Sequence, residues 1–128
     1  MNERTPEPIM RIALGFMAAK HLFVASEIGL FEKLASGAAT LDELAAKCSI
    51  PRRTLRIIAD AVVSLGLLER DNGRYRNSAV AAAFLSGAGD HDLRPMLRFW
   101  DKLSYPAWLN LESAVRSGAG QVGFLPVQ

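Results

Sequence analysis

Apolar residues recur at helical spacing near the start of the chain, but they do not keep to one stripe. In the first long segment they spread over most of the helix circumference: Ile9, Ile12, Leu14, Phe16, Met17, Leu22, Phe23, Val24 and Ile28. We expect Pro8 to open one helix of about twenty residues that ends near Gly29. A helix that is apolar on nearly all sides must be covered on more than one side. A second subunit or a second domain is the expected cover, and a central helix wrapped by its own domain is the alternative.

The middle of the chain carries the local signals of two helices joined by a tight turn. Thr40 followed by Glu43 forms a capping box in front of a short apolar stripe. Residues 48–51, which end in proline, break this first helix. The second helix runs to about Leu65, and Gly66 suits the left-handed backbone position beyond its end. This arrangement predicts a helix-turn-helix.

A β-hairpin follows the second helix. Residues 67–70 and 74–77 are short strand candidates, and the segment between them, Asp71-Asn72-Gly73, supplies the positive-φ residues that a tight hairpin turn needs. Residues 40–77 therefore predict a winged helix-turn-helix. The expected fold class is mostly α with a small β-hairpin, that is, a winged helix-turn-helix with flanking helices.

Three further helices are expected after the hairpin. Ser78 caps the first, a glycine-containing segment at 87–90 ends it, and Asp92 starts the second. Pro106 is expected to open the last helix, which ends at Gly118. Aromatic residues gather on these helices: Phe99, Trp100 and Trp108. We expect most of them, Trp108 above all, to be core residues, and the alternative is the wall of a pocket for a flat apolar ligand.

Composition bounds the function classes. The chain has 128 residues, 50% of them hydrophobic, and a net charge of +2, so it is expected to be one globular domain. Its first eight residues are polar, are expected to be frayed, and lack the basic start of a signal peptide. Charged residues interrupt the apolar segment 9–28, so we expect a cytoplasmic protein without a membrane span. The single cysteine, Cys48, excludes an internal disulfide, and neither it nor His21 or His91 has companions for a metal site or a nucleophile.

The helix-turn-helix raises the question of DNA binding. Arginines occupy the start of the second helix and the wing: Arg52, Arg53, Arg74 and Arg76. Asp60, however, lies in the middle of the exposed polar strip, where it would face phosphate, and it is spaced to pair with Arg56. Ile57 and Val63 beside the strip fit better under another protein surface. From this chemistry alone, DNA binding and protein contact both stay open.

One motif resembles a cofactor loop in spacing only. Residues 118–123 match G-x-G-x-x-G, but that loop needs a strand before it, a helix after it and an acidic residue about twenty positions further on. A helix is expected before it, so we interpret this segment as a linker.

An ordered set of short motifs resembles the N-terminal domain of small-molecule O-methyltransferases that use S-adenosylmethionine. The resemblance extends over about residues 9–124 and is carried by residues 30–34 (LFEKL), residues 40–45 (TLDELA), Leu55, residues 66–68 (GLL), Gly73 with Tyr75, Trp108 and residues 114–118 (AVRSG). The resemblance implies a winged-helix domain that forms an intertwined homodimer, lends side chains to the substrate pocket and does not ordinarily bind DNA. It divides the chain into a flexible N-terminus (1–8), the dimerisation domain (9–118) and the start of a linker to a catalytic domain (119–128).

The resemblance also implies what this chain lacks. The catalytic domain, which would hold the cofactor and the catalytic histidine, is expected to be missing, so we predict no catalytic, cofactor-binding or metal-binding residue and no activity for the chain alone. The full-length parent is expected to use S-adenosylmethionine and to methylate an aromatic or polyketide-like hydroxyl. Ile9, Ile12, Phe16 and Phe23 are the predicted dimer contacts. Phe99, Trp100 and Leu103 are the predicted substrate-facing residues. A winged-helix transcriptional regulator that contacts DNA through the four arginines is the alternative.

Overall fold

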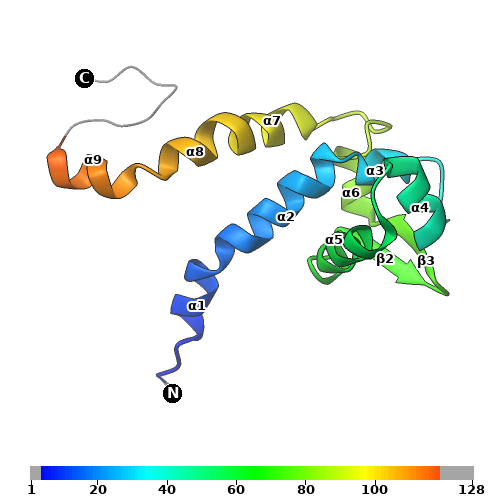
Figure 1. The fold of residues 1–128 in the computed structure, drawn as a ribbon, viewed down its shortest axis with the longest axis horizontal. Helices are drawn as coiled ribbons and strands as arrows, with labels where there is room; N and C mark the ends of the chain where they lie inside the picture. The colour runs from blue at the N-terminus through cyan, green and yellow to red at the C-terminus, as the bar shows by residue number, and fades with distance from the viewer. Residues whose placement is uncertain (1–3, 119–128) are drawn as a thin grey trace.

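Two helical arms leave a winged helix-turn-helix body (Figure 1). The computed structural model describes residues 4–118; the predicted linker at 119–128 lies outside this range. The elements in chain order are α1 (Glu7–Ala13), α2 (Gly15–Glu27), α3 (Leu30–Lys33), β1 (Ala39–Thr40), α4 (Leu41–Cys48), α5 (Arg52–Ser64), β2 (Leu68–Asp71), β3 (Arg74–Asn77), α6 (Ala79–Phe84), α7 (Arg94–Phe99), the π-helical turn η1 (Trp100–Ser104), α8 (Tyr105–Trp108) and α9 (Leu111–Ser117). The fold is mostly helical with one small antiparallel sheet, which confirms the predicted fold class.

The helix-turn-helix forms as its local signals predict. The Thr40 hydroxyl accepts a hydrogen bond from the Glu43 N–H (3.2 Å), and the Glu43 carboxylate accepts one from the Thr40 N–H (2.9 Å). This capping box satisfies two N–H groups that a helix start otherwise leaves unpaired. Pro51 takes the N-cap position of α5, and Gly66 adopts the left-handed conformation beyond its end (φ 81°).

The wing is a hairpin extended by a third strand. β2 and β3 pair antiparallel through a turn in which Asn72 (φ 53°) and Gly73 (φ 74°) both have positive φ, as predicted. β1 pairs with the other edge of β3, with Ala39 opposite Tyr75, so the strand order is β1-β3-β2. β1 was not predicted from the sequence, because two residues are too few to show strand periodicity.

The core lies under α5 and the sheet. Its largest fully buried side chains come from α3, α4, α5 and β2: Phe31, Leu30, Leu44, Leu55, Leu68 and Val62. Short helix α3 packs between α2 and α4, and it places Phe31 in the centre of this core. The winged body is thus held by apolar contacts between elements far apart in the sequence.

The N-terminal arm consists of two helices, where one was predicted. The helix begins at Glu7 and is interrupted at Leu14, whose ψ of 2° lies outside the helical range, directly before Gly15. Glycine is a poor helix former, which accounts for a break at this place. Residues 7–27 are long and apolar enough to cross a membrane by length and composition, and few of them are buried. A helical arm that buries its apolar side chains against a protein partner is likewise long, apolar and exposed in a single copy.

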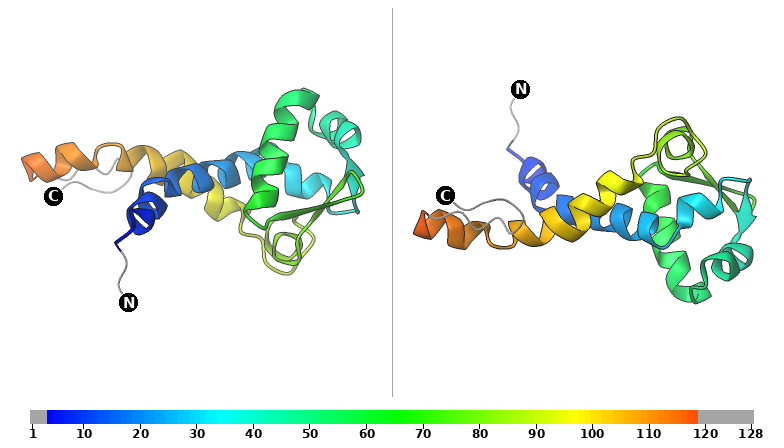
Figure 2. Two further views of the ribbon diagram at one scale, coloured as in Figure 1. Left: turned by 90° about the horizontal axis from the view of Figure 1, so that it is seen from below. Right: turned by 90° about the horizontal axis from the view of Figure 1, so that it is seen from above.

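The C-terminal arm continues through Pro106, where a new helix start was predicted. Pro106 has no N–H to donate to a carbonyl one turn earlier, and the helix widens just before it: the Tyr105 N–H donates to the Trp100 carbonyl five residues back. The last helix starts only at Leu111. Both arms extend from the same side of the winged body and separate towards their ends (Figures 1 and 2).

Candidate dimer interface and ligand surfaces

The two arms carry most of the exposed large apolar side chains. On the N-terminal arm Ile9 is 70% and Ile12 82% exposed, and on the C-terminal arm Leu109 is 75% and Val115 73% exposed. Scattered exposed apolar residues are ordinary, but a continuous set along two neighbouring elements marks an interaction surface. The described chain leaves this surface open to solvent.

The predicted dimer contacts fall into two groups. Ile9, Ile12 and Phe16 lie on the open surface of the N-terminal arm. Phe23 is half-buried and packs against the core of its own body, so a large part of its surface is already covered within one chain. The arm therefore offers its apolar face mainly over α1 and the first half of α2.

The expected burial of the late aromatic residues is wrong. Phe99 and Trp100 are each more than two-fifths exposed, and Trp108 is 63% exposed. Leu103 is exposed as well. Only Leu97, Asp101 and Ala107 of this arm are buried. The inner face of this arm is narrow, so Phe99, Trp100 and Trp108 keep large exposed surfaces.

An apolar groove of about 360 Å³ lies between α2, α5 and α8. Phe16, Met17, Val24 and Ile58 form its apolar part. Lys20, His21 and Tyr105 form its polar end, and His21 Nδ1 lies 2.6 Å from the Met17 carbonyl oxygen. Ile58 and Tyr105 were not predicted as site residues, because the groove exists only once α5 and α8 have packed beside α2.

Lys20 of this groove also forms an ion pair with a buried carboxylate. Asp101, on the π-helical turn, is 5% exposed, and its carboxylate accepts a hydrogen bond from Lys20 Nζ on α2 at 2.6 Å. Burial alone would raise the pKa of Asp101, but the hydrogen bond and charge of Lys20, with a weaker contribution from Lys102, lower it below its ordinary value. The Lys20 ammonium also lies 5.2 Å from the centre of the Tyr105 ring.

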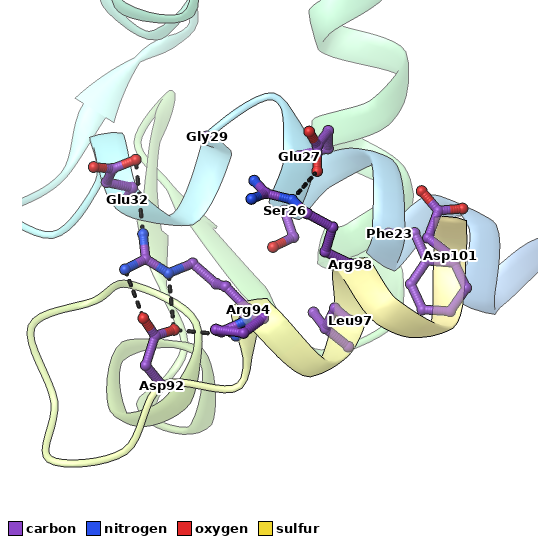
Figure 3. Close-up of a pocket in the computed structure, with 11 residues that line it drawn as sticks. Phe23, Ser26, Glu27, Gly29, Glu32, Asp92, Arg94, Leu97, Arg98 and Asp101 are labelled. Carbon is purple, nitrogen blue, oxygen red and sulfur yellow. Dashed lines mark hydrogen bonds and ion pairs between the residues drawn. The ribbon is translucent and has the colours of Figure 1, made fainter. Parts of the chain in front are cut away.

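A second hollow, of about 370 Å³, lies between α2, α3 and α7 (Figure 3). Two ion pairs cross it: Arg94 Nη1 lies 3.7 Å from Glu32 of α3, and Arg98 Nε lies 3.2 Å from Glu27 of α2. Arg94 Nη2 also lies 2.8 Å from Asp92 of its own segment. The hydrogen bonds from the Arg94 side chain and backbone lower the pKa of Asp92 to about 2. Because carboxylates already neutralise both guanidinium groups, the hollow is a joint between elements and not an open anion site. Within residues 4–118 no group of three or more His, Cys, Asp or Glu side chains is placed to hold a metal ion.

The arginines considered for DNA contact are mostly paired with carboxylates. Arg52 lies 2.6 Å from Asp42, and Arg76 lies 2.8 Å from Glu69. Arg74 lies 3.7 Å from Glu43, and Arg53 is exposed at the start of α5. A phosphate would have to displace a carboxylate at three of these four positions, which weighs against a DNA-reading surface.

Asp60 has a structural role in the wing. Its carboxylate accepts hydrogen bonds from the Tyr75 hydroxyl (2.6 Å) and from Arg70 Nη1 (3.0 Å), and Arg56 lies 3.6 Å away, as the sequence spacing predicted. Burial would raise the pKa of Asp60, but the hydrogen bonds from Tyr75 and Arg70 lower it. Burial and the hydrogen bond to Asp60 raise the pKa of Tyr75. This network fastens β3 to α5.

Tyr75→Phe is expected to lower the free energy of unfolding by about 1.5 kcal/mol at neutral pH, because a hydrogen bond to a charged acceptor is lost. Tyr75 keeps its proton in the folded protein to a higher pH than in the unfolded chain, so its contribution is complete below about pH 10 and is lost as the pH rises through the folded pKa. Urea unfolding at pH 7 and at pH 11 measures both effects. If Tyr75→Phe loses as much stability between these pH values as the wild type does, Tyr75 is not the titrating group.

The family profile described as "O-methyltransferase dimerisation domain" matches residues 10–87. The chain belongs to this family. The match includes the second half of the first arm helix, all of α2 and the entire winged body. The exposed apolar side chains of the N-terminal arm from Met10 onwards therefore lie in a domain that is named for dimerisation, whereas the C-terminal arm lies outside the matched residues.

Similar proteins extend this match to the C-terminal arm. The chain is 38% identical over 114 residues to 3-hydroxy-5-methyl-1-naphthoate 3-O-methyltransferase of Streptomyces sahachiroi, which covers 89% of this chain and 33% of that protein. It is 37% identical over 116 residues to N,N-dimethyltransferase OxyT of Streptomyces rimosus, covering 90% of this chain and 33% of that protein. The crystal structure of human N-acetylserotonin methyltransferase in complex with SAM superposes with a TM-score of 0.85 at 29% identity, over 98% of this chain and 39% of that chain. The chain thus spans about a third of the length of the curated relatives it matches.

Proposed function

We propose that this dimerisation domain joins two copies of an S-adenosylmethionine-dependent methyltransferase and forms part of the wall of the acceptor pocket. The observation that carries the proposal is the uncovered apolar surface of the two arms, in a chain of this family. An exposed apolar surface on the arms costs free energy in water, and its burial against a second copy recovers it. For the protein that carries this domain, we propose a homodimer that transfers methyl groups to an acceptor held partly by this domain.

The homodimer is supported by the form of the surface. A two-fold dimer uses the same patch on both copies, so the patch must be complementary to itself. An arm with Ile9, Ile12 and Phe16 exposed meets this condition, because aliphatic and aromatic side chains pack against one another without a need for opposite charges. Three of the four residues predicted as dimer contacts are those that a single copy leaves most open on this face, and the fourth, Phe23, is half-buried.

An aromatic or polyketide-like acceptor is supported by the C-terminal arm. Phe99, Trp100 and Leu103 present ring and aliphatic surface to solvent, and such side chains suit a flat apolar ligand. A relative in Streptomyces sahachiroi is named for a naphthoate, which is flat and aromatic. We propose that these three residues face the acceptor and exclude water from it.

The described residues do not fit S-adenosylmethionine itself. Their sheet consists of three short antiparallel strands, and within residues 4–118 no strand leads through a glycine-rich turn into a helix, the arrangement that holds nucleotide-like cofactors. We therefore propose that this domain positions copies and acceptor, and that the purified 128-residue chain shows no methyl transfer. The cofactor seen with the human relative is expected to bind in the portion of the parent protein that this chain does not match.

Sedimentation velocity of the purified chain over a hundredfold range of concentration tests the proposal. We expect a concentration-dependent shift from one to two copies, with the dimer predominant at the highest concentrations. Flotation with neutral lipid vesicles is the companion measurement, because residues 7–27 also satisfy the length and composition of a membrane segment. A chain that stays monomeric at every concentration, or that floats with vesicles and does not dimerise, contradicts the proposed function.

A further inference from the structure

Two ion pairs join α2 to the C-terminal arm, and they differ in burial. Lys20 pairs with Asp101 at 2.6 Å; the Asp101 side chain is only 4% exposed, whereas the Lys20 side chain is 45% exposed. Glu27 pairs with Arg98 at 3.2 Å, and both of these side chains are open to solvent (Figure 3). An exposed pair contributes little to a fold, whereas a buried carboxylate that loses its cation is strongly unfavourable. The two pairs therefore have different consequences although they connect the same parts of the chain.

The pair joins the middle of α2, where Lys20 lies, to the π-helical turn, which carries Asp101. The two arms separate towards their ends at α1 and α9 (Figures 1 and 2). The ammonium of Lys20 reaches both the Asp101 carboxylate and the Tyr105 ring, so one side chain connects α2 to the π-helical turn and to α8. A change at this point alters the angle between the arms more than it alters the winged body.

We propose that Lys20 and Asp101 are positioning residues of the dimer interface, which fix the angle between the arms so that both apolar faces meet a second copy as one surface. This inference rests on the proposed homodimer. Neither residue needs to touch the partner, because each acts through the placement of the apolar side chains that do. Rigid presentation of two faces lowers the ordering cost of association.

The surroundings of the Asp101 carboxylate indicate what the loss of Lys20 would do to the C-terminal arm. Without Lys20, this carboxylate would keep only Lys102, whose Nζ lies 3.5 Å away at the exposed side of the turn. The arm rests on one side of α2, so a movement of the arm away from α2 would bring the carboxylate into water at small structural cost. A π-helical turn is a common site of such adjustments. Loss of Lys20 is therefore expected to release the arm rather than to unfold the body.

Lys20→Met and its matched control Arg98→Met test the proposal. Each removes the cation of one ion pair between α2 and the C-terminal arm, and the two differ in whether the remaining carboxylate is buried. We expect Lys20→Met to raise the dimer dissociation constant by about tenfold, measured by sedimentation, and Arg98→Met to change it less than about threefold. Backbone amides of residues 97–108 should exchange hydrogen faster in Lys20→Met and at the wild-type rate in Arg98→Met.

The double variant Lys20→Met/Asp101→Asn separates positioning from stability. It removes both charges, so no unpaired carboxylate stays buried, and its melting temperature should return towards that of the wild type. A positioning role predicts that its dimer stays weak, because the bond that sets the angle is absent. Recovery of both the melting temperature and the dimer would overturn the inference, as would equal dimer affinities of Lys20→Met and Arg98→Met. If the wild type itself never dimerises, the proposed function fails. In that case, equal hydrogen exchange of the C-terminal arm in the two single variants would separately refute the positioning role of Lys20 and Asp101.

Discussion

Ile12→Glu is expected to raise the dimer dissociation constant at least about a hundredfold. Ile12 is 82% exposed in one copy and lies in the last turn of α1. A carboxylate at this position remains hydrated in the single chain, but it would have to lose that hydration inside an apolar interface, which costs several kcal/mol without a cationic partner. The winged body does not contact this side chain, so its own stability should change little.

Sedimentation of Ile12→Glu beside Ala79→Glu makes the measurement specific. Ala79 is exposed in the first turn of α6, on the body, where an added carboxylate is compatible with the helix dipole. Both variants carry the same extra charge, so a general effect of charge would weaken both dimers equally. A dimer of Ile12→Glu as tight as that of Ala79→Glu would exclude α1 from the interface.

Phe31→Ala is expected to lower the free energy of unfolding by about 3–5 kcal/mol. Phe31 is 1% exposed and is the largest fully buried side chain of the core. It belongs to the four-residue helix α3, and its backbone carbonyl accepts a hydrogen bond from Asn77 Nδ2 at the end of β3 (3.0 Å). Removal of the ring would leave a cavity at the point where helices and wing meet, and a helix this short has few other contacts with which to close it.

Urea unfolding of Phe31→Ala should be compared with that of Phe99→Ala, both in the Ile12→Glu background. The background removes the contribution of dimerisation, which otherwise makes apparent stability depend on concentration. Both changes remove the same ring, but Phe99 is 42% exposed, so its loss should cost clearly less. Equal losses in the two variants would show that Phe31 is not central to the core.

The winged body could be predicted from the sequence because its boundaries are set by local chemistry. Thr40 and Glu43 cap each other whatever the rest of the chain does, and Asn72-Gly73 accept positive φ more readily than most residue pairs. The family was predicted from the order of such short motifs along the chain. Its dimerisation role agreed with the pattern of the first helix, which is apolar on too many sides for one copy to cover.

The arms were predicted less well, because their form depends on contacts between distant residues. Pro106 ordinarily marks a helix start, and only the wider turn before it lets the helix pass through. Trp108 was expected in the core because aromatic side chains usually are, but it is 63% exposed because only a narrow face of its arm packs against the rest of the chain. The Lys20–Asp101 pair joins residues 81 positions apart, and sequence spacing carries no sign of it.

The pairing of the wing's arginines has a consequence for how this surface behaves in solution. Where a carboxylate sits beside a guanidinium, few counterions gather around either, and an approaching polyanion gains little entropy from setting them free. The winged surface should therefore attract nucleic acid only weakly at long range, and added salt should have little effect on this attraction. We therefore expect this winged fold, a class often used to bind DNA, to bind duplex DNA only weakly even at low salt.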